Sequence, residues 1–326
     1  MTDKILVTTR SFRKVEGRHQ QMLLDAGYEI VNSPYDRPAT GDELAEMIGG
    51  VVAAILGVDE VSEKAIAAGK HLKVLSRFGV GVDSVDVAAA TRHGVPVTIT
   101  PGANSIAVAE LTLALMLTLS RRVAEFGRAA QHGSWSPLPG WELSGSTLGV
   151  MGMGRIGREV ARRAAAFDMT ILFYDPFPPP ADFVAQVNCQ SVSIEALLER
   201  SDFITLHLPL SEETHHLLNA ARLVLCKPTA YLINTARGGL VDETALCDAL
   251  MRGTLAGAAF DVFEQEPPTG SPLLALPNFV AMPHAGSATR QTTQRMGVMA
   301  AENALMMLRG ERPPESHIVN PEVFGR

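Results

Sequence analysis

Short apolar runs alternate with longer amphipathic segments from the beginning of the chain. The runs at Lys4–Thr8, Val51–Leu56 and Lys73–Ser76 predict strands, because a strand covered by helices on both faces is apolar along most of its length. The segments Gly17–Ala26 and Ser62–Ala68 between them predict helices. This alternation of strands and helices is typical of a parallel α/β fold.

A second series of the same kind begins with a strand at Thr147–Met151. Helices are predicted at Arg155–Ala166 and Glu243–Arg252. The further strands of this series are predicted at Thr170–Tyr174, Phe203–Leu208, Ala230–Asn234, Ala256–Phe260 and Phe279–Met282. We therefore expect an α/β protein of two doubly wound parallel-sheet domains, Rossmann-like or flavodoxin-like, with a cleft between them.

Two long helices decide how the chain divides. One is predicted over Ser105–Gly127, between the two series of strands. The other, roughly Ser287–Arg309, follows the second series and is long enough to cross back to the first domain. We expect a discontinuous first domain formed by residues 1–100 and 288–326, and a second domain formed by residues 101–287.

Composition and charge narrow the class of protein. Of the 326 residues, 46% are hydrophobic and 19% are charged, which is the composition of a folded chain of two ordinary domains. The net charge of −7 disfavours nucleic acid as a partner, since phosphate binding needs a basic face. The longest apolar run, Ile106–Leu119, is interrupted by Glu110 and is shorter than the ~20 residues of a membrane span. No membrane association is expected.

The cysteines form no recognisable motif. Cys189, Cys226 and Cys247 are widely spaced and show neither a CxxC nor a metal-ligand pattern. They predict reduced thiols in a cytoplasmic protein and no metal site. The alternative, a catalytic thiol, lacks a recognisable nucleophile motif around any of the three. The N-terminal residues predict a first strand and no signal peptide.

Residues 152–157, Gly-Met-Gly-Arg-Ile-Gly, form a GxGxxG pattern. Alone, this pattern is equally well explained as a tight strand-to-helix turn. Here an apolar strand, Leu148–Met151, runs into it, a helical segment leaves it, and the next strand ends in Asp175. This order of elements is the one that a dinucleotide-binding fold requires.

Each residue of this loop has a physical role in dinucleotide binding. Gly152 permits the tight turn, Gly154 lets the backbone approach a pyrophosphate, and Gly157 permits close packing of helix and strand. Arg155 adds a positive charge at the helix N-terminus, where free amides and the helix dipole already favour phosphate.

Asp175 indicates which dinucleotide is bound. Its carboxylate would accept hydrogen bonds from the adenosine ribose and would repel a 2′-phosphate. No lysine or arginine occurs between Pro176 and Ala181 to bind such a phosphate. We therefore expect NAD and not NADP as the cofactor.

Three polar residues each follow a separate apolar strand of the second series. They are Arg237, Glu266 and His284. Each has a plain structural explanation in isolation, as a helix cap, a solvated loop residue or a structural histidine. Because the carboxyl ends of parallel strands meet at one edge of a sheet, the three can converge beside the dinucleotide site. Together they predict a catalytic centre.

The chain resembles the D-isomer-specific 2-hydroxyacid dehydrogenases, and within them the phosphoglycerate-dehydrogenase-like branch, over essentially its whole length. The motifs that carry the resemblance are Arg77-Phe-Gly-Val-Gly-Val-Asp-Ser-Val-Asp86, Pro101-Gly-Ala-Asn104-Ser, Val108-Ala-Glu110, Thr147-Leu-Gly, the glycine loop, His207-Leu-Pro209-Leu, Thr214, Asn234-Thr-Ala-Arg237-Gly-Gly239, Asp261-Val-Phe-Glu-Gln-Glu266-Pro267 and Pro283-His284. The resemblance implies an NAD-dependent oxidoreductase. Residues 101–287 would then bind NAD, and the discontinuous domain would bind the substrate.

The resemblance also implies the roles of the catalytic residues. Arg237 would bind the substrate carboxylate and keto oxygen, and His284 would be the general acid and base. Glu266 would hydrogen-bond the far nitrogen of His284 and favour its protonated form. A glutamate at this position argues against formate dehydrogenase, in which the corresponding residue is a glutamine.

The remaining implied contacts belong to the cofactor and the substrate. Asp261 would contact the nicotinamide carboxamide. The other cofactor contacts would come from Ile156, His207, Pro209, Thr214, Thr235, Ala236, His284 and Gly286, in addition to the glycine loop. The backbone amides of Val80 and Gly81 would receive the substrate carboxylate, and Arg77 and Asn104 are further substrate candidates.

Several alternatives stay open from the sequence. The substrate would be a small anionic 2-hydroxy or 2-oxo acid, with 3-phosphoglycerate, glycerate or hydroxypyruvate, and glyoxylate as candidates. The loop with Asp59 and Glu60 carries no cation and disfavours a phosphorylated substrate, unless Arg77 or a neighbouring subunit compensates. A dehydrogenase of an inorganic anion such as phosphite would use the same fold. So would an NAD-responsive binding protein like the C-terminal-binding-protein co-repressors.

Two expectations concern assembly and regulation. The helix Ile106–Leu119, with Trp135 and Trp141 nearby, resembles the dimer-forming segment of the family and predicts a homodimer, although a core helix within one chain explains it equally well. The chain ends soon after His284, so no C-terminal regulatory domain is expected.

Overall fold

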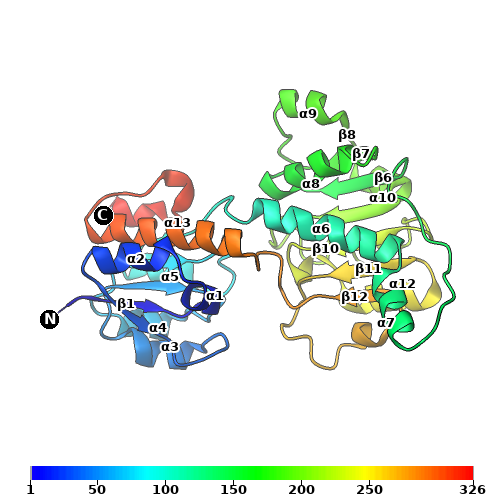
Figure 1. The fold of residues 1–326 in the computed structure, drawn as a ribbon. Coiled ribbons are helices and arrows are strands. Elements are labelled where there is room, and N and C mark those ends of the chain that lie inside the picture. The colour runs from blue at the N-terminus through cyan, green and yellow to red at the C-terminus, as the bar shows by residue number, and fades with distance from the viewer. Residues whose placement is uncertain (1, 326) are drawn as a thin grey trace. The chain divides into compact units, whose positions relative to one another are not determined.

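The computed structural model describes residues 2–325, which form two compact units (Figure 1). The first unit holds residues 1–104 and 287–326, and the second holds residues 105–286. The sequence predicts the first division after residue 100, whereas the structure places it after Asn104. The turn before Asn104 stays with the first unit, because Arg295 donates a hydrogen bond from Nε to the carbonyl oxygen of Ala103 at 3.0 Å.

The first unit contains a five-stranded parallel sheet in the order β2-β1-β3-β4-β5. This order is that of flavodoxin-like doubly wound folds. The strands are β1 (Lys4–Val7), β2 (Glu29–Asn32), β3 (Ala53–Leu56), β4 (Val74–Arg77) and β5 (Val97–Thr98). The central strands β3 and β4 are buried along their whole length, which explains why β3 is apolar throughout and β4 begins with an apolar pair.

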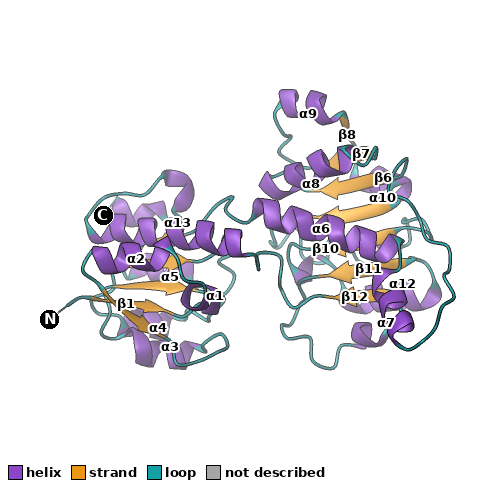
Figure 2. Ribbon diagram, in the orientation of Figure 1, coloured by secondary structure: helices purple, strands orange, loops and turns teal. Residues whose placement is uncertain are grey.

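Helices cover both faces of this sheet (Figure 2). The C-terminal helix α13 packs on α2 and on strands β3 and β4, while α3, α4 and α5 pack against one another. The helices are α1 (Arg10–Lys14), α2 (Arg18–Asp25), α3 (Gly41–Ile48), α4 (Glu63–Ala68), α5 (Val87–Arg92) and α13 (Arg290–Leu308), with short 3₁₀ segments η3 (Glu315–His317) and η4 (Pro321–Phe324). The end of the chain therefore completes the unit that its beginning starts.

The second unit contains a seven-stranded parallel sheet in the order β12-β11-β10-β9-β6-β7-β8. The strands are β6 (Thr147–Met151), β7 (Thr170–Tyr174), β8 (Cys189–Ser191), β9 (Phe203–Leu206), β10 (Tyr231–Asn234), β11 (Gly257–Phe260) and β12 (Phe279–Ala281). The strand order reverses between β6 and β9, so the loops after these strands diverge at this point. Ligands of open α/β sheets bind at such a switch point.

The helices of the second unit also lie on both faces of the sheet. In Figure 1, α6 and α8 cross one face, and contacts place α10 on the other. The helices are α6 (Ser105–Ser120), α7 (Val123–Gln131), α8 (Arg155–Ala165), α9 (Ala181–Val187), α10 (Ile194–Arg200), α11 (Ala220–Leu223) and α12 (Glu243–Arg252), with 3₁₀ segments η1 (Gly238–Leu240) and η2 (Pro272–Ala275). The predicted class, two doubly wound parallel-sheet domains, is confirmed.

One predicted element is wrong in its extent. The expected single helix over Ser105–Gly127 is two helices, α6 and α7. Arg122 separates them in the left-handed region, at φ 53°. A residue with a side chain adopts this conformation only at a local cost, so the sequence carries no sign of the break.

Two general expectations can be compared with the described residues. No helix within residues 2–325 is long and apolar enough to cross a membrane. Cys189, Cys226 and Cys247 are buried and unpaired. Burial raises the pKa of the Cys226 thiol to about 12 and also raises the pKa of Cys189. Neither thiol is therefore an activated nucleophile.

Candidate active site

The glycine loop between β6 and α8 shows why each glycine is needed. Gly152 has φ 99°, and a Cβ there would lie 2.6 Å from the carbonyl carbon of His207. A Cβ on Gly157 would lie 2.0 Å from the carbonyl oxygen of Gly152. Gly154 faces open space, and no side chain caps the N-terminus of α8 that it begins. The loop thus presents free amides beside an open surface, which fits the pyrophosphate of NAD.

Asp175, at the end of β7, is tied directly to this loop. Its Oδ2 accepts a hydrogen bond from the amide of Met153 at 2.6 Å, and its Oδ1 accepts one from Phe177 at 2.7 Å. A carboxylate has about four acceptor positions, so both oxygens retain capacity for ribose hydroxyls. Asp175 therefore fixes the glycine loop in addition to the ribose-binding role expected from sequence.

The residues after β9 that are predicted to contact the cofactor lie in a compact turn. Thr214 donates from Oγ1 to the carbonyl oxygen of Pro209 at 2.7 Å and accepts from the amide of Ser211 at 2.7 Å. His207 contacts the hydroxyl of Thr205 through Nε2 at 2.9 Å. Burial lowers the pKa of His207 to about 3, so its ring is neutral at physiological pH. It does not take part in proton exchange near pH 7.

The loop after β10 is shaped by Asn234, a residue that sequence reasoning does not single out. Asn234 accepts from the amide of Ala236 at 3.0 Å and donates to the carbonyl oxygen of Arg237 at 2.9 Å. Thr235 is buried and lies within hydrogen-bond distance of Thr112 on α6, at 3.0 Å between the hydroxyls. A buried asparagine that ends an apolar strand is the signal that could have revealed this role.

Arg237 is held close to the next loop of the sheet. Its Nη1 donates to the carbonyl oxygen of Ala236 at 2.6 Å. A Cβ on the following residue, Gly238, would lie 1.9 Å from the carbonyl carbon of Phe263 and 2.2 Å from the amide nitrogen of Glu264. The backbones of the two loops therefore touch, and only glycine fits at the contact.

Glu266 and His284 form an ion pair in the second unit. Oε2 of Glu266 lies 2.7 Å from Nδ1 of His284, and Oε1 accepts the amide of Phe263 at 3.2 Å. The hydrogen bond to Glu266 raises the pKa of His284 above its usual value, against the opposite effect of burial. Burial acts to raise the pKa of Glu266, but the hydrogen bond and charge of His284, together with the amide of Phe263 and the charge of Arg237, lower it further, and the net shift is downward. Each partner thus stabilises the charged form of the other.

Asp261 holds the backbone around His284. Its Oδ1 accepts the amide of Ala285 at 2.6 Å, and its Oδ2 accepts the amide of Gly286 at 2.7 Å. The amide of His284 itself donates to the carbonyl oxygen of Asp261 at 2.9 Å. His284 has φ 53°, a conformation that a residue with a side chain keeps only where its surroundings hold it. The buried carboxylate of Asp261 supplies that constraint.

The candidate substrate residues lie in the first unit. Arg77 is buried and donates from Nε to the carbonyl oxygen of Gly81 at 2.9 Å and from Nη1 to that of Leu56 at 3.4 Å. It thus shapes the loop that contains Val80. Asn104 is half-buried and ends the turn before α6.

The Asp59 carboxylate is part of the structure of its loop. It accepts hydrogen bonds from the amides of Ala39 at 2.8 Å and Gly57 at 2.9 Å and from the hydroxyl of Thr8. The neighbouring Glu60 is exposed and accepts from the amide of Gly41 at 2.9 Å. No lysine or arginine occurs between Gly57 and Val61.

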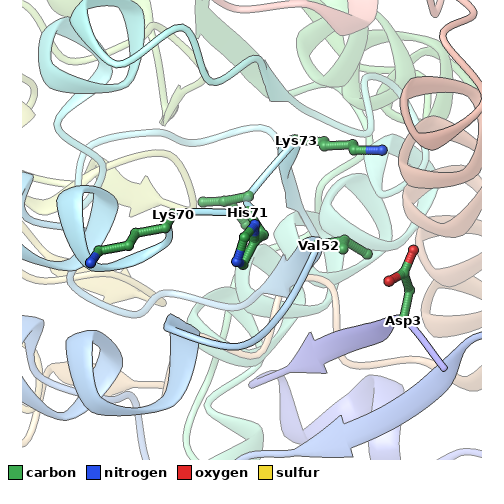
Figure 3. Close-up of a pocket in the computed structure, with 6 residues that line it drawn as sticks. Asp3, Val52, Lys70, His71 and Lys73 are labelled. Carbon is green, nitrogen blue, oxygen red and sulfur yellow. The ribbon is translucent and has the colours of Figure 1, made fainter. Parts of the chain in front are cut away.

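Figure 3 shows an open hollow in the first unit. It lies where β1, β3 and β4 begin, whereas Arg77 is the last residue of β4. Its lining comes from the residues before β1 and β4 and from Val52, namely Asp3, Val52, Lys70, His71, Leu72 and Lys73. Lys70 and Lys73 point in opposite directions in Figure 3 and do not converge on one ligand. None of the predicted site residues lines this hollow.

Known proteins resemble the chain over nearly its full length. Residues 113–286 match the sequence profile of the D-isomer specific 2-hydroxyacid dehydrogenase NAD binding domain. A glyoxylate reductase of Thermofilum pendens is 42% identical over 93% of this chain and 91% of its own length. A D-3-phosphoglycerate dehydrogenase of Methanocaldococcus jannaschii is 43% identical over 83% of this chain, which spans 52% of that protein.

Solved structures agree with this assignment. The TT0316 protein of Thermus thermophilus is 42% identical, with a TM-score of 0.87 over 97% of this chain and 99% of its own. The sequence match covers both units, and the second unit holds both the paired Glu266 and His284 and an intact glycine loop. The chain is an NAD-dependent oxidoreductase that belongs to the D-isomer-specific 2-hydroxyacid dehydrogenase family.

Proposed function

We propose that Arg237, Glu266 and His284 carry the reaction, and that the chain reduces a small, unphosphorylated 2-oxo acid. The observation that supports this most directly is the 2.7 Å contact between Glu266 and Nδ1 of His284. It orients the imidazole and leaves Nε2, which has no hydrogen-bond partner among residues 2–325, for the substrate oxygen.

His284 exchanges the proton. In reduction the imidazolium donates from Nε2 to the keto oxygen of the substrate, and Glu266 stabilises the charged ring until the proton leaves. In oxidation the neutral imidazole accepts the hydroxyl proton. Bound NAD supplies or accepts the hydride.

Arg237 binds and orients the substrate. Its guanidinium pairs with the carboxylate, and a planar fork of donors fixes the alpha carbon in one orientation. Its positive charge also acts to lower the pKa of His284, against the larger effect of Glu266. Without substrate, Arg237 thereby favours proton release from His284.

The second unit provides the NAD-binding residues. The amides at the N-terminus of α8 and Arg155 would hold the pyrophosphate, and Asp175 would accept the ribose hydroxyls. The loops after β9 and β10, which contain His207 and Thr235, would line the nicotinamide side. Asp261 would hold the backbone after His284 through the amides of Ala285 and Gly286, and its oxygens retain acceptor positions for the nicotinamide carboxamide.

The charges near Asp59 argue for an unphosphorylated substrate. Arg77 donates to backbone carbonyls of its own unit, and residues 57–61 contain two acids and no lysine or arginine. A dianionic phosphate would meet repulsion there. The glyoxylate reductase named above also matches this chain over most of its own length. Glyoxylate and hydroxypyruvate are therefore the proposed substrates.

A substrate panel tests this proposal. NADH oxidation at 340 nm would be compared for glyoxylate, hydroxypyruvate, phosphohydroxypyruvate, pyruvate and larger 2-oxo acids. The highest kcat/KM is expected for glyoxylate or hydroxypyruvate. A preference for phosphohydroxypyruvate would overturn it and favour the second candidate, a phosphoglycerate dehydrogenase, which the relative from Methanocaldococcus jannaschii supports.

We further propose a homodimer in the cytoplasm. Trp135 is 87% exposed and Trp141 is 60% exposed, both in the segment after α7, where Leu138 is also exposed, and Val123 is exposed at the start of α7. Aromatic side chains in this position gain most from a second copy of the chain. Sedimentation should give a dimer, and Trp135→Ser with Trp141→Ser should shift it to monomer. A monomeric wild type would reject the proposal. Three unpaired thiols support a reducing compartment.

A further inference from the structure

A second polar cluster lies directly beside the proposed catalytic residues. It consists of His216, from the segment after β9, Glu264, from the loop after β11, and Glu243, at the start of α12. We call these three residues the His216 bridge. None of them has a role in the proposed reaction, but each lies next to a loop that carries a proposed catalytic residue.

His216 is attached to the loop of Arg237 through its backbone. Its amide donates to the carbonyl oxygen of Gly239 at 2.7 Å, two residues beyond Arg237. His216 has φ 49°, a left-handed conformation that is unfavourable for a residue with a Cβ. Its ring stacks on that of His215, with 3.9 Å between the centroids. The backbone geometry is thus held at a cost, and the contacts of the ring help to offset it.

The ring of His216 also reaches the loop of Glu266. Its buried Nε2 lies 3.2 Å from Oε1 of Glu264, two residues before Glu266, at the distance of an ion pair but without the geometry of a hydrogen bond. Glu264 and Glu243 then bind each other's backbone. The amide of Glu264 donates to Oε1 of Glu243 at 2.7 Å, and the amide of Glu243 donates to Oε1 of Glu264 at 3.2 Å. The loop is therefore fastened both to His216 and to the N-terminus of α12.

We propose that the His216 bridge is a positioning device that fixes the loop of Arg237 against the loop of Glu266. The inference rests on the catalytic roles proposed for Arg237, Glu266 and His284. Gly238 already brings the two backbones into contact, and His216 is the side chain that joins both loops from a third segment. The bridge keeps the loop of Arg237 in a fixed position relative to the loop of Glu266.

The expected consequence of losing the bridge is a loss of alignment. Without the contact to His216, Glu264 and the turn that follows it become mobile, and Glu266 holds His284 less firmly. A displacement of about 1 Å in such a site can cost about 10²-fold in rate. We therefore expect His216→Ala to lower kcat by about 10- to 10²-fold. The affinity for NADH, measured by protein fluorescence quenching, should change less than kcat. The glycine loop and Asp175, which would hold the pyrophosphate and the ribose, lie after β6 and β7, and only the nicotinamide end would meet the loops after β9 and β10.

A pH profile separates positioning from a merely structural role. Glu266, Asp261 and Arg237 face His284, and the hydrogen bond to Glu266 has the largest effect on its pKa. If Glu266 is held less firmly, the pKa of His284 falls. The descending limb of the reduction rate should then move to lower pH in His216→Ala. A loss of folding stability alone would lower the amount of active enzyme without moving this limb.

The matched variants complete the experiment. His216→Gln retains an amide donor near the position of Nε2 and should recover most of the rate and the position of the limb. His215→Ala removes the stacked ring but retains the contact between His216 and Glu264, so it should change both much less than His216→Ala does.

Two outcomes would overturn the inference. One is a wild-type kcat and pH limb in His216→Ala, and the other is a His216→Gln variant no better than alanine. The measurement of His284→Ala under the same conditions keeps the two proposals apart. If His284→Ala retains full turnover, the proposed catalytic roles fail. If His284→Ala is inactive while His216→Ala has the wild-type kcat and pH limb, the catalytic roles stand and only the proposal of the His216 bridge is rejected.

Discussion

At the scale of single residues, the chemistry of His284 is set by two carboxylates that act on different atoms. Glu266 binds Nδ1 of the ring, and Asp261 binds the amides of the two residues that follow. The first interaction favours the imidazolium, and the second holds a left-handed backbone. The proposed proton donor is thus fixed in both charge and direction before any substrate binds.

The raised pKa of His284 predicts opposite pH dependences for the two directions of the reaction. Reduction needs the imidazolium, so its rate should fall as the pH rises through the raised pKa, while oxidation should rise over the same range. Glu266→Gln should shift both limbs to lower pH, because the carboxylate is the main cause of the raised pKa. His284→Ala should lower turnover by roughly 10²–10⁴-fold. Steady-state rates from pH 5 to 10 in both directions would check this; limbs unmoved in Glu266→Gln would contradict it.

Asp175 offers a second test at this scale. Asp175→Ala, combined with an arginine in place of Phe177, removes the charge that repels a 2′-phosphate and adds one that attracts it. The ratio of kcat/KM for NADPH to that for NADH should rise by at least about tenfold. Because Asp175 also accepts the amide of Met153, the activity with NADH should fall. An unchanged ratio would mean that Asp175 does not bind the ribose.

At the scale of elements, the sequence predicts buried strands and helices of regular period better than it predicts edge strands and breaks within a helix. The bounds of β6, β7 and α12 are confirmed, because apolar runs and amphipathic periods specify them directly. The edge strand β2 is missed, since two of its four residues, Glu29 and Asn32, are exposed and interrupt the apolar pattern. The break at Arg122 is missed because the left-handed region has no sequence signature at arginine.

The residues of the candidate site also differ in how well the sequence predicts them. Arg237, Glu266 and His284 are predictable because each follows a strand and carries characteristic chemistry. The amide contacts of Asp261 and the His216 bridge are not, because they depend on where backbone N–H groups come to lie after folding. Sequence reasoning names the proposed reacting groups, whereas the residues that hold them are recognised only in the folded loops.

The contact between the loops after β10 and β11 predicts a large effect of one methyl group. Gly238→Ala would place a Cβ 1.9 Å from the backbone of Phe263, which cannot yield as a flexible side chain can. We expect a loss of roughly 1–3 kcal/mol in stability and of about 10²-fold in kcat. Gly127→Ala in α7 is the control, since nothing lies within 4 Å of its Cβ, and it should be neutral or stabilising by up to ~1 kcal/mol. Equal stability of the two variants by urea unfolding would refute the close contact.

At the scale of the whole molecule, the hydrophobic core is divided between the two units. Two of the four core clusters are formed entirely by residues of the second unit, and the other two by residues of the first. Each unit therefore has a core of its own, which is what independent folding requires. The chain joins them only at the residues before α6 and before α13.

This division predicts how NAD affects unfolding, because the residues proposed to bind NAD all belong to the second unit. Calorimetry should resolve two transitions, and NAD should move only one of them. At about 100 times its Kd, NAD contributes ~2.7 kcal/mol, which corresponds to a shift of about 5–10 °C in Tm for a unit of this size. NADP at the same concentration should shift the transition less, since Asp175 repels its 2′-phosphate. A single transition that moves as a whole would show instead that the two cores unfold together and that NAD stabilises both.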